Sequence, residues 1–133
     1  GYSCAHIRRG DYLNVASHIV PDEAFRSLLC EKLSTISDNI IIVSDSKITA
    51  PLKHEIESAF SRAIFLDDAV LDTFKIHCIM RSAKLLVCSN SQFSLTAGLL
   101  SESLVFLPQK WFGSSQVEIE DKIKRLANFM IID

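Results

Sequence analysis

The feature that most constrains the fold is an alternation of short β-rich runs with longer segments of helical periodicity. The strand-like runs are expected at residues 2–7, 39–43, 63–66, 85–88, 104–107 and 130–132. The run at 39–43 is a near-continuous series of Ile and Val, which is typical of a strand covered on both faces. Parallel strands need long crossovers, and helices supply them. The alternation therefore predicts an α/β fold with a Rossmann-like, doubly wound parallel sheet.

The segments between these runs carry signals for helices. Pro21 suits the first turn of a helix, and Asp22 and Glu23 suit its positive end. An apolar stripe at helical spacing follows, made of Phe25, Leu28, Leu29 and Leu33. Further helices are expected from Pro51, over 71–83, from Gln92 to about Leu100, and over 117–129.

Length and charge limit what the chain can do. Its 133 residues suit one domain, so residues 1–133 are expected to form a single unit. The formal net charge is −2. That charge leaves no broad basic field for nucleic acid or for an anionic membrane, so any anion site must be local.

The four cysteines form no CxxC pair and no Cys/His ligand set. We expect them to be reduced residues in or near the core, and neither a disulfide framework nor a zinc site. No apolar run approaches the roughly 18 residues of a membrane span, and no signal peptide is visible. The chain starts abruptly on a strand pattern, as expected of a domain cut from a longer protein. We expect a bacterial cytoplasmic or peripheral membrane protein, or a Golgi lumenal one if the source is eukaryotic.

Three polar clusters follow predicted strands. They are His6-Ile7-Arg8-Arg9-Gly10-Asp11-Tyr12, Ser44-Asp45-Ser46 and Ser89-Asn90-Ser91-Gln92-Phe93-Ser94. Open α/β sheets bind ligands beyond the carboxyl ends of their strands. The three clusters are therefore expected to converge on one crevice.

The clusters suit a diphosphate. Arginine presents a planar fork of donors that matches phosphate oxygens, and the start of a helix offers free N–H groups. Ser91 and Ser94 add hydroxyl donors at such a helix start. The sequence contains no GxGxxG and no Walker lysine loop. We therefore expect arginine and helix to hold the phosphate without a metal.

Each cluster also has a purely structural interpretation. Arg8 and Arg9 can be a solvated pair, or can pair with Asp11 and Asp22. The two serine-rich clusters can be helix caps. His6 can be a buried histidine with satisfied hydrogen bonds. The occurrence of all three clusters at strand ends favours a binding site over these separate interpretations.

Four segments resemble motifs of glycosyltransferase family 11, the α-1,2-fucosyltransferases. They are, in order, HIRRGDY with the downstream His18, IIIVSDS, LLVCSNSQFSLTAGLL and LVFLPQKWFG. The matching segments span nearly the whole chain in the order and approximate spacing of the family. The first motif is shared in part with α-1,6- and protein O-fucosyltransferases.

This resemblance implies the carboxyl-terminal, donor-binding half of a GT-B architecture. It implies GDP-fucose as donor and a galactose-terminated glycan as acceptor, with inversion and without a metal or other cofactor. Arg8 would be the catalytic residue, which holds the β-phosphate and helps GDP leave. Arg9 would support that site. The remaining binding residues would be His6 and Asp45 near the nucleotide, and Asn90, Ser91 and Ser94 near the phosphates.

The chain differs from the family at Leu95-Thr96, where two tryptophans are usual, and at Ser46, where the second motif usually has Asp. Two alternatives therefore stay open: a related transferase with another linkage or donor, and a non-catalytic Rossmann-like binding domain. The acceptor-binding half is expected to precede this chain. Alone, the chain is expected to bind nucleotide weakly and to transfer little or no fucose.

Overall fold

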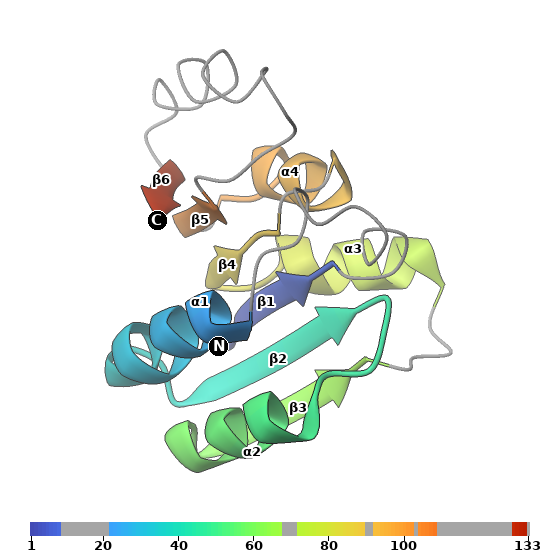
Figure 1. Cartoon of the computed structure of the whole chain (residues 1–133). Coiled ribbons are helices and arrows are strands. Elements are labelled where there is room, and N and C mark those ends of the chain that lie inside the picture. Colours follow the sequence, from blue (N-terminus) through green and yellow to red (C-terminus); the bar gives the residue numbers. More distant parts are fainter. Residues whose placement is uncertain (9–21, 68–71, 90–91, 103, 109–128, 133) are drawn as a thin grey trace, which may run out of the picture.

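A single parallel sheet organises the computed structural model, which describes residues 1–8, 22–67, 72–89, 92–102, 104–108 and 129–132 (Figure 1). Its strands are β1 (Ser3–Ile7), β2 (Asn39–Ser44), β3 (Arg62–Leu66), β4 (Leu85–Val87), β5 (Leu104–Pro108) and β6 (Phe129–Ile132). Their order is β3-β2-β1-β4-β5-β6, and every neighbouring pair is parallel. This is the strand order of a Rossmann fold, so the predicted class is confirmed.

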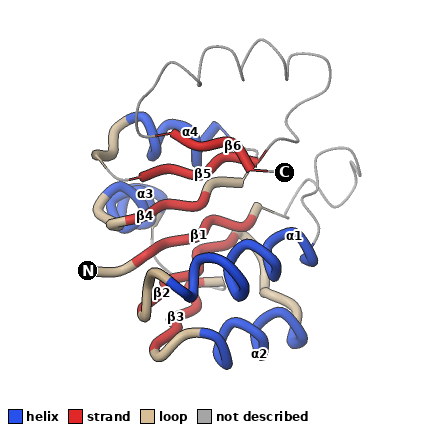
Figure 2. Tube along the Cα trace, turned by 90° about the vertical axis from the view of Figure 1, so that its left-hand side faces the viewer, coloured by secondary structure: helices blue, strands red, loops and turns tan. Residues whose placement is uncertain are grey.

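Helices cover both faces of the sheet (Figure 2). On one face lie α1 (Asp22–Arg26), which continues as a π-helical turn η3 (Ser27–Lys32) and a 3₁₀ turn η4 (Leu33–Thr35), and α2 (Ala50–Ala59). On the other face lie α3 (Thr73–Arg81) and α4 (Gln92–Leu99). The sheet is therefore wound in both directions from its centre.

The side chains of β1 alternate between two halves of the core. All five residues of this strand are buried. Ala5 and Ile7 pack in the cluster beneath α1 and α2, whereas Cys4 packs in the cluster beneath α3 and α4. Because successive side chains of a strand point to opposite faces, His6 shares the face of Cys4. The fold thus places His6 under α3 and α4, at the end of the central strand.

The predicted strands match the observed ones to within one residue at each end. The predicted stripe Phe25, Leu28, Leu29 and Leu33 is buried throughout, which confirms it as a core face. The helix predicted over 71–83 instead starts at Thr73, because Asp72 acts as its N-cap. The Oδ1 atom of Asp72 accepts a hydrogen bond of 2.8 Å from the backbone N–H of Lys75. Most of the helix predicted over 117–129 lies outside the described residues, and Phe129 begins β6.

The four cysteines are free thiols, as the sequence predicted. Cys4 and Cys88 are buried, and burial raises the pKa of Cys4 to about 12, which keeps its thiol protonated. Within the described part of the chain, no helix combines the length and apolarity that a membrane crossing requires.

Candidate functional site

The order of the strands reverses between β1 and β4. From β1 the chain proceeds outward to β2 and β3, then crosses to the other side of β1 to form β4. Sheets of this kind bind ligands at such a switch point, beyond the carboxyl ends of the strands. Three of the predicted site residues, His6, Arg8 and Asp45, lie at that edge.

A pocket of about 310 Å³ opens at this edge, on the side of α3 and α4. The ends of β1, β2 and β3 and the first turns of α3 and α4 form its walls. The lining residues are His6, Arg8, Ser44, Asp45, Leu66, Thr73, Ile76 and Phe93. Its volume falls at the lower end of the range of about 300–1,000 Å³ seen for small-molecule sites.

Arg8 and Asp45 form an ion pair at this pocket. The parallel register aligns Ile7 with Ser44, so the residues that follow them leave the sheet side by side. Nε of Arg8 lies 3.3 Å from Oδ2 of Asp45, and the two side chains are 30% and 26% exposed. A partly exposed pair contributes about 0–1 kcal/mol to stability. Its main effect is therefore to orient the guanidinium at the pocket.

Ser44 links the end of β2 to the end of β1 by a hydrogen bond. Its hydroxyl donates a hydrogen bond of 2.7 Å to the carbonyl of Ile7, and accepts one of 3.2 Å from the N–H of Ser46. The interpretation of Ser44-Asp45-Ser46 as a helix cap is wrong, because the N-cap residue of α2 is Thr49. The hydrogen bonds of Ser44 fix this turn at the end of the sheet instead, and Asp45 in the turn faces Arg8.

His6 is buried, with 4% of its surface exposed. Its Nδ1 is in hydrogen-bond contact with Oγ of Ser94 and lies 3.1 Å from Oγ of Ser89. The ring also meets Phe93 edge-on, with 5.6 Å between centroids. Burial lowers the pKa of His6 to about 4; the charge of Asp45 opposes this shift and that of Arg8 adds to it. His6 is therefore a neutral polar group at pH 7.

Ser94 lies behind His6. It is fully buried on α4, and its Oγ accepts a hydrogen bond of 3.3 Å from the backbone N–H of Ser89. The residues that line the pocket include His6 but not Ser94. Arg9, Asn90 and Ser91 lie outside the described residues, and their roles stay predictions.

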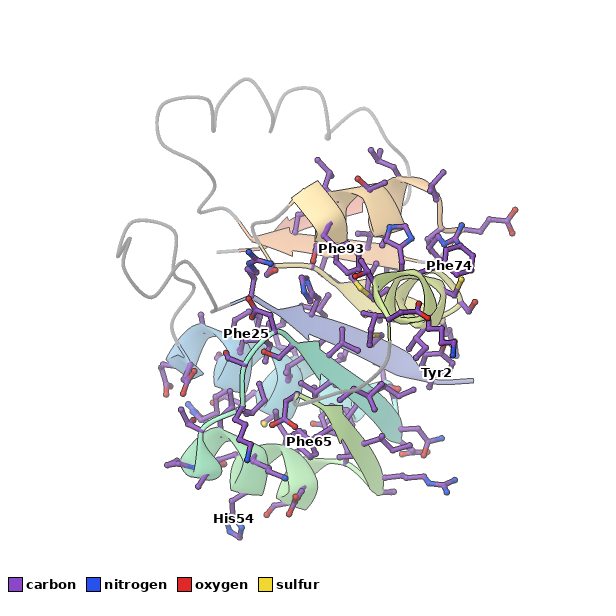
Figure 3. The ribbon with its side chains drawn as sticks, turned by 90° about the vertical axis from the view of Figure 1, so that its right-hand side faces the viewer. Tyr2, Phe25, His54, Phe65, Phe74 and Phe93 are labelled. Carbon is purple, nitrogen blue, oxygen red and sulfur yellow. The ribbon has the colours of Figure 1, made fainter. Side chains whose placement is uncertain are left out.

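Five lining residues were absent from the predicted binding residues, although the first and last of them stand in the predicted polar clusters: Ser44, Leu66, Thr73, Ile76 and Phe93. Figure 3 shows Phe93 on the side of the sheet that carries α3 and α4. Beyond Phe93 lies His77 of α3, with ring centroids 5.1 Å apart. The sequence could have placed Leu66 and Thr73 at the pocket. The end of the third strand and the start of the next helix must reach the same edge as the ends of β1 and β2.

Among the described residues, no group of three or more His, Cys, Asp or Glu side chains is placed to hold a metal ion. Comparisons of the chain with protein-family models, with curated proteins and with solved structures find no match.

Proposed function

We propose that this chain is the sugar-nucleotide-binding half of a fucosyltransferase. GDP-fucose is its donor, and fucose passes with inversion to a galactose-terminated glycan in an α-1,2 linkage. A preceding acceptor-binding domain completes the enzyme. The observation that carries the proposal is the paired Arg8 and Asp45 beside His6 at a pocket on the switch-point edge. The four motifs that resemble the fucosyltransferases supply the choice of donor.

Arg8 has the chemistry that the transfer needs. In the reaction, a hydroxyl of the acceptor attacks the anomeric carbon of fucose as the bond from that carbon to the β-phosphate oxygen breaks. GDP leaves with an added negative charge, and the hydroxyl proton passes to a general base. A guanidinium fixed beside the leaving oxygen stabilises the developing charge. The ion pair with Asp45 holds Arg8 in place before the donor arrives.

The rest of the pocket suits a nucleoside. Folds of this strand order commonly hold a ribose hydroxyl with an acidic side chain, because a carboxylate accepts hydroxyl protons. Asp45, directly after β2, is the acidic residue of the pocket. Leu66, Ile76 and Phe93 supply apolar surface against which a base can pack.

Isothermal titration calorimetry in the presence of EDTA tests the proposal. GDP is expected to bind, UDP and NAD to bind at least tenfold more weakly, and EDTA to make no difference. Hydrogen bonds to charged groups contribute about 1.5–3 kcal/mol, so Arg8→Ala is expected to weaken GDP binding by roughly tenfold or more. Arg62→Ala, an exposed arginine at the opposite end of β3, is the matched control and is expected to bind GDP normally.

The other outcomes are equally informative. Tighter binding of UDP than of GDP would show that GDP-fucose is not the donor. Absence of any nucleotide binding at millimolar concentration would favour a non-catalytic domain. Equal losses in Arg8→Ala and Arg62→Ala would place the phosphate elsewhere.

A further inference from the structure

The sheet has an open edge at β3. Among the strands that the structure describes, β3 is the outermost on its side and pairs only with β2 (Figure 1). Exposed edge strands are usually protected by charges, proline or bulges, because their N–H and C=O groups can pair with another chain. After Arg62, residues 63–66 of β3 are Ala, Ile, Phe and Leu. This edge therefore carries neither a charge nor a proline after its first residue.

The outward-facing backbone groups of β3 belong to Ala63 and Phe65. The backbone N–H of Arg62 donates a hydrogen bond of 3.2 Å to the carbonyl of Asp38, so the polar backbone groups of Arg62 face β2. Backbone groups of successive residues in a strand point to opposite sides, so those of Ile64 also face β2. Those of Ala63 and Phe65 then point away from the sheet, with Ile64 midway between them.

This spacing fits an antiparallel pairing of β3 with a second copy of itself. A two-fold axis through Ile64 sets Ala63 of each copy opposite Phe65 of the other. Opposite residues of this kind in antiparallel strands exchange both of their N–H···O bonds. The outward-facing backbone groups of both copies are then satisfied in one register.

The side chain at the axis suits the same pairing. Ile64 pairs with Ile41 of β2, which packs in the core cluster beneath α3 and α4, so Ile64 lies on that side of the sheet. It is a large apolar side chain that is 44% exposed. In the joined sheet, its two copies lie opposite each other in a non-hydrogen-bonded pair, where side chains approach most closely. Each copy then shields the other from water.

On the other face of the sheet, α2 supplies opposite charges on either side of the axis. The Nζ atom of Lys53 lies 5.0 Å from the centroid of the Phe65 ring, which places Lys53 over β3. Glu57 is one helical turn further along and therefore on the same side of α2. Because α2 runs antiparallel to β3, Lys53 lies toward the end of β3 and Glu57 toward its start. The axis brings Lys53 of each copy toward Glu57 of the other.

We propose that β3 is a self-association edge: two copies of the chain pair through β3, antiparallel and centred on Ile64, to form one continuous sheet. The two symmetric contacts between Lys53 and Glu57 favour this register over others. Because the strands of the partner run in the opposite direction, the two ligand pockets open at opposite edges of the joined sheet. The pairing needs no nucleotide, so it is independent of the proposed function.

Sedimentation velocity over a range of protein concentrations measures the association. The mass is expected to rise from the monomer value of 14.9 kDa to twice that value as the concentration approaches the millimolar range. Ile64→Lys sets two like charges opposite each other, and Ala63→Pro removes an N–H that faces the partner, so each variant should stay monomeric. Leu104→Lys, at a side chain 38% exposed on β5, is the control and should associate like the wild type.

Charge exchange tests the register. Lys53→Glu and Glu57→Lys each set like charges together at both symmetric contacts, so each should raise the dissociation constant of the dimer roughly tenfold. The double variant should restore the wild-type constant. A double variant as weak as the single ones would show that the two side chains do not meet and would overturn the register.

A disulfide tests the axis. The Cα atoms of a non-hydrogen-bonded antiparallel pair are about 4.5 Å apart, within the range that a disulfide spans. Oxidised glutathione should therefore link two copies of Ile64→Cys. It should link neither the wild type nor Arg62→Cys, whose position lies opposite Leu66 of the partner. Equal linking of Arg62→Cys and Ile64→Cys would contradict the axis.

A wild-type protein that stays monomeric at millimolar concentration would overturn the proposal. A dimer that persists unchanged in both Ile64→Lys and Ala63→Pro would also overturn it, because another surface would then hold the two copies together. Circular dichroism checks that both variants fold, and should they unfold, the charge variants on α2 decide the same question. If the dimer forms and GDP does not bind, the proposed function fails and the association edge stands.

Discussion

At the scale of single residues, the pocket depends on two polar contacts of opposite character. The pair Arg8–Asp45 is partly exposed, so solvent screens the attraction and the pair adds little stability. The contact between His6 and Ser94 is buried, where the loss of a hydrogen-bond partner is costly. Substitutions at the first contact should affect binding, and those at the second should also affect folding.

Arg8→Ala is accordingly expected to leave the fold intact. The free energy of unfolding should change by less than about 1 kcal/mol, the usual limit for an ion pair that solvent screens. Urea unfolding followed by circular dichroism measures it, with Arg62→Ala as the reference. A loss of several kcal/mol would show that Arg8 is a structural residue and would weaken its assignment to the phosphate.

His6 makes stability depend on pH. Its pKa is about 4 in the folded protein and has an ordinary value of 6.5. Between these values the unfolded chain binds more protons, so stability is full above about pH 6.5 and falls as the pH drops toward 4. The loss from this group is expected to reach about 2 kcal/mol at pH 5.

The measurement is the difference in unfolding free energy between pH 7 and pH 5, from urea titrations. His6→Gln removes the titrating group, so its difference should be smaller by about the same 2 kcal/mol. His54→Gln is the control, since His54 is exposed and points away from α2 (Figure 3). Equal pH dependence in wild type and His6→Gln would show that His6 protonates as easily folded as unfolded.

At the scale of elements, α3 links the cap at Asp72 to the pocket. The first turn of this helix carries Thr73 and Ile76, both of which line the pocket. The Asp72 carboxylate holds that turn through the N–H of Lys75. The position of one pocket wall therefore depends on a single capping residue at the surface.

Asp72→Ala is expected to destabilise the protein by about 1 kcal/mol, the usual effect of losing an N-cap. GDP affinity should fall several-fold, because the first turn frays in the free protein and must be ordered on binding. Urea unfolding and calorimetry measure the two effects. Asp38→Ala, at an exposed aspartate before β2, should change neither stability nor GDP affinity. Unchanged stability and affinity in Asp72→Ala would mean that the cap does not order the α3 wall of the pocket.

The elements themselves were predictable from local patterns. Apolar runs such as 39–43 mark strands because a central parallel strand is buried on both faces. The helix boundaries were less predictable, as at Asp72, because a cap depends on one side-chain hydrogen bond. The three clusters at strand ends were expected at one edge because all carboxyl ends of a parallel sheet point the same way.

At the scale of the whole molecule, the sheet separates two halves of one core. Ile42 of β2 packs with the half beneath α1 and α2, and Leu86 of β4 with the half beneath α3 and α4. Both side chains are fully buried. Since the same strands supply both halves, the described elements should unfold in one cooperative transition.

Ile42→Ala and Leu86→Ala are therefore each expected to cost about 2–5 kcal/mol, and each should shift the whole transition. Circular dichroism and the amide NMR signals of both halves of the core in urea should give coincident curves. Ile64→Ala, at a side chain 44% exposed on β3, should cost much less. Two separate transitions would mean that the two halves of the core fold independently.

The sequence alone did not predict which side chains contact one another across the fold. Nothing local to Arg8 points to Asp45, which lies in a different cluster. The two meet because β1 pairs with β2 in the register that aligns Ile7 with Ser44. The contact of His6 with Ser94 likewise depends on how α4 packs over β1 and β4. Such contacts are set by tertiary packing, so the candidate residues could be named and their partners could not.

The central claim is that the edge bearing Arg8, Asp45 and His6 holds a nucleoside diphosphate. The most direct test is a titration of the ¹⁵N-labelled protein with GDP, with backbone amide signals followed by NMR. The account predicts that the largest shifts fall on residues of the pocket, at the ends of β1 and β2 and the starts of α3 and α4. Shifts confined to other parts of the molecule, such as the 81–84 turn at the opposite edge, or no shifts at millimolar GDP, would contradict it.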